Sequence, residues 1–219
     1  MLTSRRGWNL RCGFNFLNQC IKTINRRPLI ENSSNRLAVF FPGVGYHCDK
    51  PLLYYAGKIA SEEGYEEIIR LSYSSEIKNI RGDKGKMKMV FDELYARTEA
   101  ALSAVNWFDY DDILFVSKSV GTVIACAYAK QHGIECRQVL YTPLEATFMF
   151  EPKNAMAFTG DADPWVVHED LVKCSQDASV PMTVIEGADH SLETGDTARN
   201  LEILSNVMEK TKLFLQTKL

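Results

Sequence analysis

The residues best suited to chemistry in this chain are a serine, two aspartates and a histidine that follow predicted strands. They are Ser119, Asp161, Asp163 and His190. A serine hydroxyl becomes a nucleophile when a neighbouring histidine takes its proton and a carboxylate orients that histidine. In parallel sheets, the carboxyl ends of the strands meet at one edge, where ligands bind. These four positions therefore predict a nucleophilic site at that edge.

Ser119 stands at the sharpest predicted turn of the chain. The apolar run Ile113–Val116 is typical of a strand that is buried on both faces. The small residues Ser117, Ser119 and Gly121 follow at once, and apolar residues then recur at helical spacing. Such a turn pushes its apex residue out of the sheet, with the positive end of the helix behind it. A tight strand-to-helix turn with an exposed serine remains the alternative interpretation.

The first strand also ends in an unusual loop. Leu37–Phe41 is apolar, and Pro42-Gly43-Val44-Gly45 follows. The loop is not a phosphate-binding loop of the usual NTPase form, because no Gly-Lys-Ser/Thr follows it. An ordinary glycine-rich turn between a strand and a helix is one interpretation, and a loop that lines the site is the other.

Two late strands are followed by the remaining candidates. Asp161 and Asp163 lie in Thr159-Gly-Asp-Ala-Asp-Pro-Trp165, and His190 ends Glu186-Gly-Ala-Asp-His190. Because Asp163 precedes a proline, it is also a natural N-cap for a helix that begins there. Three other histidines are present: His132 and His168 are expected on helix surfaces, and His47 follows the glycine loop, where it could line the site.

The string Ser117-Lys118-Ser119-Val120-Gly121 resembles the nucleophile elbow of the α/β-hydrolase superfamily, Gly-x-Ser-x-Gly, with serine in place of the first glycine. Gly-x-x-Asp and Gly-x-x-His follow late strands, in that superfamily's order of serine, acid and histidine. The resemblance extends from about Leu37 to the C-terminus. It implies a triad and an oxyanion hole made of backbone amides, with the substrate beside them. The catalytic residues would be Ser119, His190 and Asp163, with Asp161 as the rival acid. The oxyanion donors would be Val120 and Val44, or Gly45 in place of Val44. The residues lining the substrate would be Gly43, Gly45, Tyr46, Lys118 and Trp165.

This resemblance implies a serine hydrolase that cleaves a carboxylic ester, thioester or lactone through an acyl-enzyme intermediate, with no metal or cofactor. In size the chain resembles small uncapped esterases and dienelactone hydrolase, although the latter uses cysteine where this chain has Ser119. A ligand receptor or scaffold that keeps the fold without catalysis is the alternative. A redox protein acting through Cys48 has little support, because no resolving cysteine is near it in sequence.

The surroundings of the predicted site give two further expectations. An apolar rim is expected after the fourth strand, from Leu144, Phe148, Met149 and Phe150. A group of basic residues lies in or beside the loop that is predicted over 73–88, either as solvated charges or as an attraction for an anionic acyl group: Lys78, Arg81, Lys84, Lys86 and Lys88.

Strands and helices alternate along the chain. This pattern predicts an α/β, doubly wound, mostly parallel sheet with helices on both faces. Only residues 142–154 separate the fourth strand from the fifth, which is too short for a cap domain. The remaining strands are expected at Glu67–Leu71, Arg137–Tyr141, Ala155–Phe158 and Met182–Ile185. Helices are expected from Pro51, around Val90 and Leu94, after Gly121 and over about Pro164–Cys174. A closing helix is expected to carry one apolar face made of Leu201, Leu204, Val207, Met208 and Leu215.

Composition bounds the partners. The 219 residues carry a net charge of −3, so the chain has no overall field for nucleic acid or an anionic membrane. No apolar run reaches membrane-spanning length, and six scattered cysteines favour a reducing, cytoplasmic compartment. Residues 1–35 form a basic segment, expected as edge strands, with an organelle-targeting segment as the alternative; residues 36–219 form the hydrolase domain. A small ester-type molecule is the expected partner, and the oligomeric state is left open.

Overall fold

The structure is a computed structural model that describes residues 34–77 and 79–217. The edge strands predicted for residues 1–35 lie outside the described residues, apart from Ser34 and Asn35. Lys78 also lies outside them. All of the described residues belong to one compact unit.

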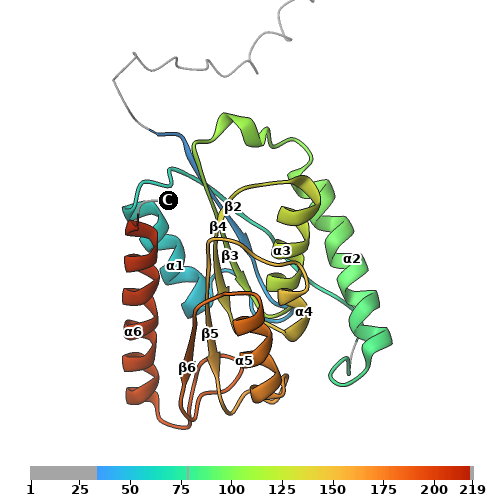
Figure 1. Ribbon diagram of the computed structural model, residues 1–219, viewed down its shortest axis with the longest axis vertical. Coiled ribbons are helices and arrows are strands. Elements are labelled where there is room, and N and C mark those ends of the chain that lie inside the picture. Colours follow the sequence, from blue (N-terminus) through green and yellow to red (C-terminus); the bar gives the residue numbers. More distant parts are fainter. Residues whose placement is uncertain (1–33, 78, 218–219) are drawn as a thin grey trace, which may run out of the picture. The chain divides into compact units, whose positions relative to one another are not determined.

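The described residues form a parallel sheet, as predicted (Figure 1). Its strands lie in the order β2-β1-β3-β4-β5-β6, and every neighbouring pair is parallel. The order reverses beside β1, which is the arrangement of a doubly wound sheet. The strands are β1 (Arg36–Phe41), β2 (Glu67–Arg70), β3 (Asp112–Lys118), β4 (Arg137–Tyr141), β5 (Ala155–Gly160) and β6 (Met182–Ile185).

Helices cover both faces of this sheet, as predicted. Figure 1 shows α1 and α6 on one side of the strands and α2 and α3 on the other. The helices are α1 (Pro51–Glu62), α2 (Lys84–Leu102), α3 (Val120–His132), α4 (Glu145–Phe148), α5 (His168–Asp177) and α6 (Thr197–Gln216), with a 3₁₀ turn, η1, at Trp107–Asp109.

The central strands are buried on both faces because alternate side chains enter different layers. In β1, Ala38 and Phe40 pack in the core beneath α1 and α6. Leu37, Val39 and Phe41 pack in the core beneath α2 and α3. All five are 0% exposed. This double burial explains why β1 is an uninterrupted apolar run.

Two helix starts differ from the prediction. α2 begins at Lys84, inside the segment that was predicted as a loop, because the Asp83 carboxylate caps it by accepting the Lys86 N–H at 3.0 Å. α5 begins at His168, after N-cap Val167, and not at Pro164. Asp163 is therefore no N-cap, and its carboxylate is available for another role.

The connection between β4 and β5 contains only the four-residue helix α4, so no cap domain covers the sheet edge at this point. Within the described residues, no helix is long and apolar enough to cross a membrane.

Candidate active site

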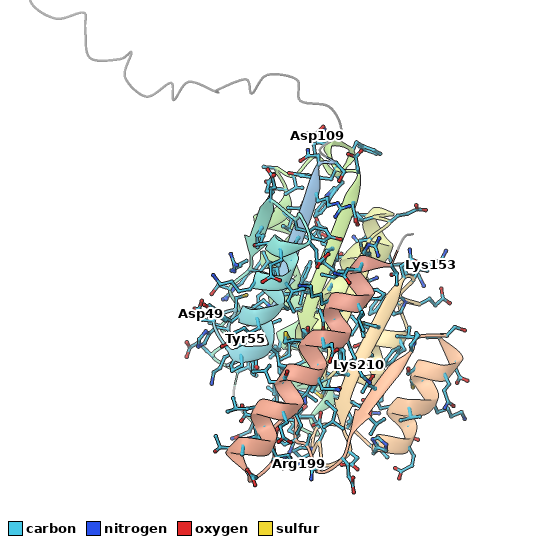
Figure 2. All side chains as sticks on the ribbon, turned by 90° about the vertical axis from the view of Figure 1, so that its left-hand side faces the viewer. Asp49, Tyr55, Asp109, Lys153, Arg199 and Lys210 are labelled. Atoms are coloured by element: carbon cyan, nitrogen blue, oxygen red, sulfur yellow. The ribbon has the colours of Figure 1, made fainter. Side chains whose placement is uncertain are left out.

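The carboxyl edge of the sheet collects the predicted site residues. Ser119 follows β3, Asp163 lies just beyond β5, and His190 follows β6. Figure 2 gives the orientation: Asp109, at the amino edge, and Arg199, at the carboxyl edge, lie at opposite ends of the view. The Arg199 guanidinium donates to the Glu186 carbonyl just after β6, at 3.1 Å.

Ser119 occupies a strained backbone conformation between β3 and α3. Its φ of 56° and ψ of −128° lie in a region that non-glycine residues rarely adopt. Neighbouring hydrogen bonds hold it there: the Ser119 N–H donates to the Tyr141 carbonyl at 3.1 Å, and the Thr122 N–H donates to the Ser119 carbonyl at 2.9 Å. Gly121 completes the turn, because a Cβ there would lie 2.2 Å from the Phe41 carbonyl oxygen. The helix can thus approach β1 only with glycine at this position.

The Ser119, His190 and Asp163 side chains form one chain of hydrogen bonds. Ser119 Oγ lies 2.8 Å from His190 Nε2, and His190 Nδ1 lies 2.6 Å from Asp163 Oδ2. A carboxylate accepts only, so Nδ1 carries the proton and Nε2 is left to accept the serine hydroxyl. The arrangement can therefore transfer the hydroxyl proton to the imidazole.

The two candidate acids have different surroundings. The Asp163 carboxylate is fully buried; beside its contact with His190, its Oδ1 accepts the Trp165 N–H at 2.9 Å. Asp161 is exposed, and its Oδ1 accepts the Gly187 N–H at 2.6 Å. Asp163 thus contacts the histidine, whereas Asp161 holds the loop that carries it.

The loops after β5 and β6 come together at Gly160. A Cβ at Gly160 would lie 2.0 Å from the Ala188 carbonyl oxygen. That same oxygen accepts the Ala162 N–H at 3.1 Å. The close backbone approach brings Asp163 and His190 within hydrogen-bonding distance, although they lie 27 residues apart.

Burial sets the protonation of the imidazole. Desolvation lowers the pKa of His190 from its ordinary value, and the nearby Lys118 charge lowers it further, while Asp163 acts to raise this pKa. With the lowering effects dominant, the imidazole is neutral at neutral pH and is ready to accept a proton.

Lys118 is itself a buried charge beside the nucleophile. Only 1% of the residue is exposed, and its Nζ lies 4.7 Å from the centre of the Tyr46 ring. Burial lowers the pKa of Lys118 to about 7, against the attraction of Asp163 and Asp189. The sequence predicted Lys118 at the substrate, and the structure places it in the wall of the cleft with almost no exposed surface.

A cleft with a volume of about 520 Å³ opens over Ser119 and His190. It is lined by all of the residues predicted at the substrate, namely Gly43, Gly45, Tyr46, Lys118 and Trp165. The Trp165 and His190 rings lie 5.5 Å apart. Five further lining residues were not predicted from the sequence: Ile77, Ile80, Pro164, Asp189 and Ser191. Ile77 and Ile80 lie in a loop without a motif, whereas Pro164, Asp189 and Ser191 lie within or directly beside the loops that carry Asp163 and His190.

Val44 and Val120, the two predicted oxyanion donors, both line the cleft. Gly43 and Tyr46 exchange their N–H groups and carbonyls at 3.2 Å, so the Gly43 amide is already engaged. Val44, at the tip of this turn, is 37% exposed and lines the cleft. Val120 is the first residue of α3, where an N–H has no acceptor within the helix. Val44 and Val120 are therefore suited to bind an oxyanion.

Several other sequence candidates lie elsewhere. His47 is paired with Asp49 at 3.5 Å and does not line the cleft. Burial raises the pKa of Cys48 to about 11, which keeps it a thiol at neutral pH. Of the predicted rim, Leu144 and Phe148 are buried, each 6% exposed, and Met149 and Phe150 do not line this cleft. The basic residues Lys84, Lys86 and Lys88 belong to α2 and not to a loop.

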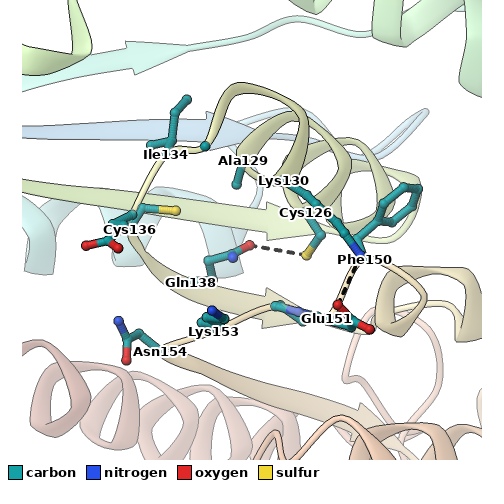
Figure 3. Close-up of a pocket in the computed structure, with 13 residues that line it drawn as sticks. Cys126, Ala129, Lys130, Ile134, Cys136, Gln138, Phe150, Glu151, Lys153 and Asn154 are labelled. Atoms are coloured by element: carbon teal, nitrogen blue, oxygen red, sulfur yellow. Dashed lines mark hydrogen bonds and ion pairs between the residues drawn. The ribbon is translucent and has the colours of Figure 1, made fainter.

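A hollow with a volume of about 400 Å³ lies at the amino edge of the sheet (Figure 3). Gln138, in β4, and Asn154, just before β5, line it. Burial raises the pKa of both of its cysteines, Cys126 and Cys136, so both are thiols at neutral pH. Histidine and serine are absent from its described lining, and residues 34–77 and 79–217 bring together no group of three His, Cys, Asp or Glu side chains placed to hold a metal ion.

The similar proteins of known structure agree on the fold. No protein-family model matches the sequence, and no curated protein matches it. Among solved structures, the esterase Est1E of Butyrivibrio proteoclasticus is similar over 85% of this chain and 91% of its own, with 14% identity and a TM-score of 0.57. The esterase Pf2001 of Pyrococcus furiosus is similar over 84% and 83%, with 12% identity and a TM-score of 0.58. A serine hydrolase without a lid from Xanthomonas campestris is similar over 88% of both chains, with 12% identity and a TM-score of 0.52.

These similarities define the class of fold. The chain has the α/β-hydrolase fold, in the form that lacks a lid or cap domain, as the sequence predicted. The neighbouring structures are those of serine hydrolases and esterases.

Proposed function

We propose that this protein is a serine hydrolase that cleaves a carboxylic ester, thioester or lactone of a small molecule. The observation that carries the proposal is the hydrogen-bonded chain from Ser119 Oγ through His190 to the buried Asp163 carboxylate, with contacts of 2.8 and 2.6 Å. The fold supports the proposal, since the neighbouring structures include esterases, and Est1E has been solved with ferulic acid bound.

In the acylation step, Ser119 Oγ forms a bond to the substrate carbonyl carbon while His190 Nε2 takes the hydroxyl proton. Asp163 keeps the proton on Nδ1 and stabilises the imidazolium. The carbonyl oxygen becomes an oxyanion, which the Val120 and Val44 N–H groups bind. His190 then gives its proton to the leaving group as the bond to that group breaks.

In the deacylation step, water takes the place of the alcohol. His190 removes a proton from the water as its oxygen bonds to the acyl carbon, and it returns the proton to Ser119 as the ester to the enzyme breaks. The products are an acid and free enzyme. Every step of this chemistry uses protein groups and water alone.

Labelling with a fluorophosphonate tests the proposal directly. We expect an adduct on Ser119, mapped by mass spectrometry, that is lost in His190→Ala because the hydroxyl is then no longer activated. Ser119→Ala should lower kcat/KM for p-nitrophenyl esters about 10⁴-fold or more. The control Ser103→Ala changes an exposed serine at the end of α2 and should retain both labelling and turnover.

Absence of both labelling and turnover in a protein with an intact thermal transition would refute the proposal. A small ligand that raised the melting temperature of that protein would then favour the receptor or scaffold function.

A further inference from the structure

A second cavity adjoins the cleft over Ser119. It has a volume of about 410 Å³ and lies between the first turns of α2, the start of α3 and residues 146–150. Its size falls within the range of small-molecule sites, about 300–1,000 Å³. The walls are built mainly from large apolar side chains, among them Met87, Phe91, Val123, Met149 and Phe150.

The cavity shares part of its wall with the proposed active site. Ile80 and Val120 line both this cavity and the cleft that contains Ser119. Val120 directly follows Ser119, and its N–H is a proposed oxyanion donor. A group attached to the carbonyl carbon at Ser119 would therefore reach the cavity past the Val120 and Ile80 side chains.

The one charged side chain in the described lining is turned to another partner. Lys88 Nζ pairs with Asp92 Oδ2 at 2.5 Å, one turn further along α2. The other described lining side chains are apolar and offer a ligand no strong hydrogen bond. Binding here would thus be driven by the removal of apolar surface from water.

The position of His190 indicates which half of an ester enters the cavity. The leaving-group oxygen takes its proton from His190 Nε2, so the alcohol half must leave beside His190, where Trp165, Pro164 and Ser191 line the cleft. The acyl half extends away from the histidine. The Val120 and Ile80 side, where the cavity opens, is the side left for it.

We propose that this cavity binds the acyl chain of the substrate, which makes the protein a hydrolase of esters or thioesters of medium-length, apolar carboxylic acids. The inference rests on the proposed function, because it assigns the substrate class of the same Ser119 site. We name the cavity the acyl cavity.

The test compares p-nitrophenyl esters from acetate to octanoate. Because a methylene that is fully buried in the transition state contributes about 0.8 kcal/mol, we expect kcat/KM to rise about two- to fourfold per methylene until the cavity is filled. In Ala146→Trp, the indole fills the cavity from an exposed position, and the ratio of octanoate to acetate kcat/KM should fall at least about tenfold. Met149→Lys places a charge at the lip, on a residue that is 75% exposed, and should lower the same ratio.

Two controls sharpen the result. Ala96→Trp introduces the same side chain on an exposed face of α2 outside both cavities, and it should keep the ratio. A series of alkyl acetates lengthens the alcohol half instead, and Ala146→Trp should leave its chain-length dependence as in the unmodified protein.

The two proposals fail in different ways. Absence of ester turnover together with an unlabelled Ser119 would overturn the hydrolase itself. Turnover with a flat acyl profile, a ratio unchanged by Ala146→Trp, or a loss confined to the alkyl acetates would overturn the acyl cavity alone. A dimer that Ala146→Trp dissociates in sedimentation, with the octanoate-to-acetate ratio unchanged, would also overturn it, because the acyl cavity would then hold a second copy of the chain.

Discussion

The buried charge of Lys118 should leave a measurable trace in the pH dependence of folding. The side chain is almost fully buried in the folded chain, and burial lowers its pKa to about 7. In the unfolded chain it returns to the ordinary value for lysine, about 10.4. Between these values the unfolded state holds one proton more than the folded state, so the free energy of unfolding rises with pH.

The size of this effect follows from the two pKa values. Each pH unit between them adds about 1.36 kcal/mol, and the slope fades near either end. From pH 6 to pH 9 the contribution of Lys118 is about 2–3 kcal/mol. Lys118→Met replaces the ammonium with an apolar group of similar length and removes that contribution. The stability difference, original protein minus variant, should therefore increase by about 2–3 kcal/mol from pH 6 to pH 9.

Urea unfolding at both pH values, for both proteins in the same salt, measures this double difference. Titrations common to the two proteins cancel in it, including that of Cys48, whose raised pKa lowers stability at high pH. Asp163, Asp189 and Tyr46 lie near the lysine and remain in both proteins. His190 also remains, but its pKa is less depressed without the Lys118 charge, and this change adds to the double difference in the same direction near pH 6. An identical pH dependence in the two proteins would refute the reasoning, since Lys118 would then keep its proton in the folded state at pH 9.

Three further results are expected. Lys118→Met removes a positive charge that lowers the pKa of His190, so this pKa should rise. In the pH profile of kcat/KM for an ester, the acid limb should therefore move to higher pH. An acid limb that stays in place or moves to lower pH would contradict this. Asp163→Asn should lower kcat about 10⁴-fold, because the asparagine NH₂ can donate to Nδ1 and place the imidazole proton on Nε2, the wrong tautomer for accepting the serine proton. Asp161→Asn should lower kcat less than about tenfold, and steady-state kinetics that gave the opposite ranking would make Asp161 the acid. Gly121→Ala should lower the free energy of unfolding, measured by urea denaturation, by about 3 kcal/mol or more, because the added Cβ would lie 2.2 Å from the Phe41 carbonyl oxygen of β1. A variant of unchanged stability would show that the turn can relax.

The sequence predicted the sheet well because its central strands carry the strongest local signal. β1 and β3 are buried on both faces, so each is an unbroken apolar run with small residues or glycine after it. The start of α2 was missed because Asp83 caps it within a stretch of charged residues and glycine that resembles a loop. Local pattern therefore locates buried elements better than exposed helix starts.

For the candidate site, the sequence could place residues at strand ends but could not rank them by environment. Asp161 and Asp163 differ by two positions, and only the close approach of the β5 and β6 loops at Gly160 decides which carboxylate contacts His190. The burial of Lys118 is likewise invisible in the sequence, because it depends on the Tyr46 ring from another loop. The acyl cavity depends on the missed start of α2 and was not predicted.

The packing of α6 against α1 has a consequence for how the chain is made. α6 and α1 cover one face of the sheet together, and Lys212 on α6 pairs with Glu62 at the end of α1 at 3.0 Å. A ribosome delivers α1 early and α6 only after all six strands. A nascent chain that stalls before Thr197 therefore contains Ser119, Asp163 and His190 but lacks the part of this core that α6 supplies, and the apolar surface that remains exposed favours aggregation. The core beneath α1 and α6 can thus be completed only after every residue of the proposed active site has been synthesised.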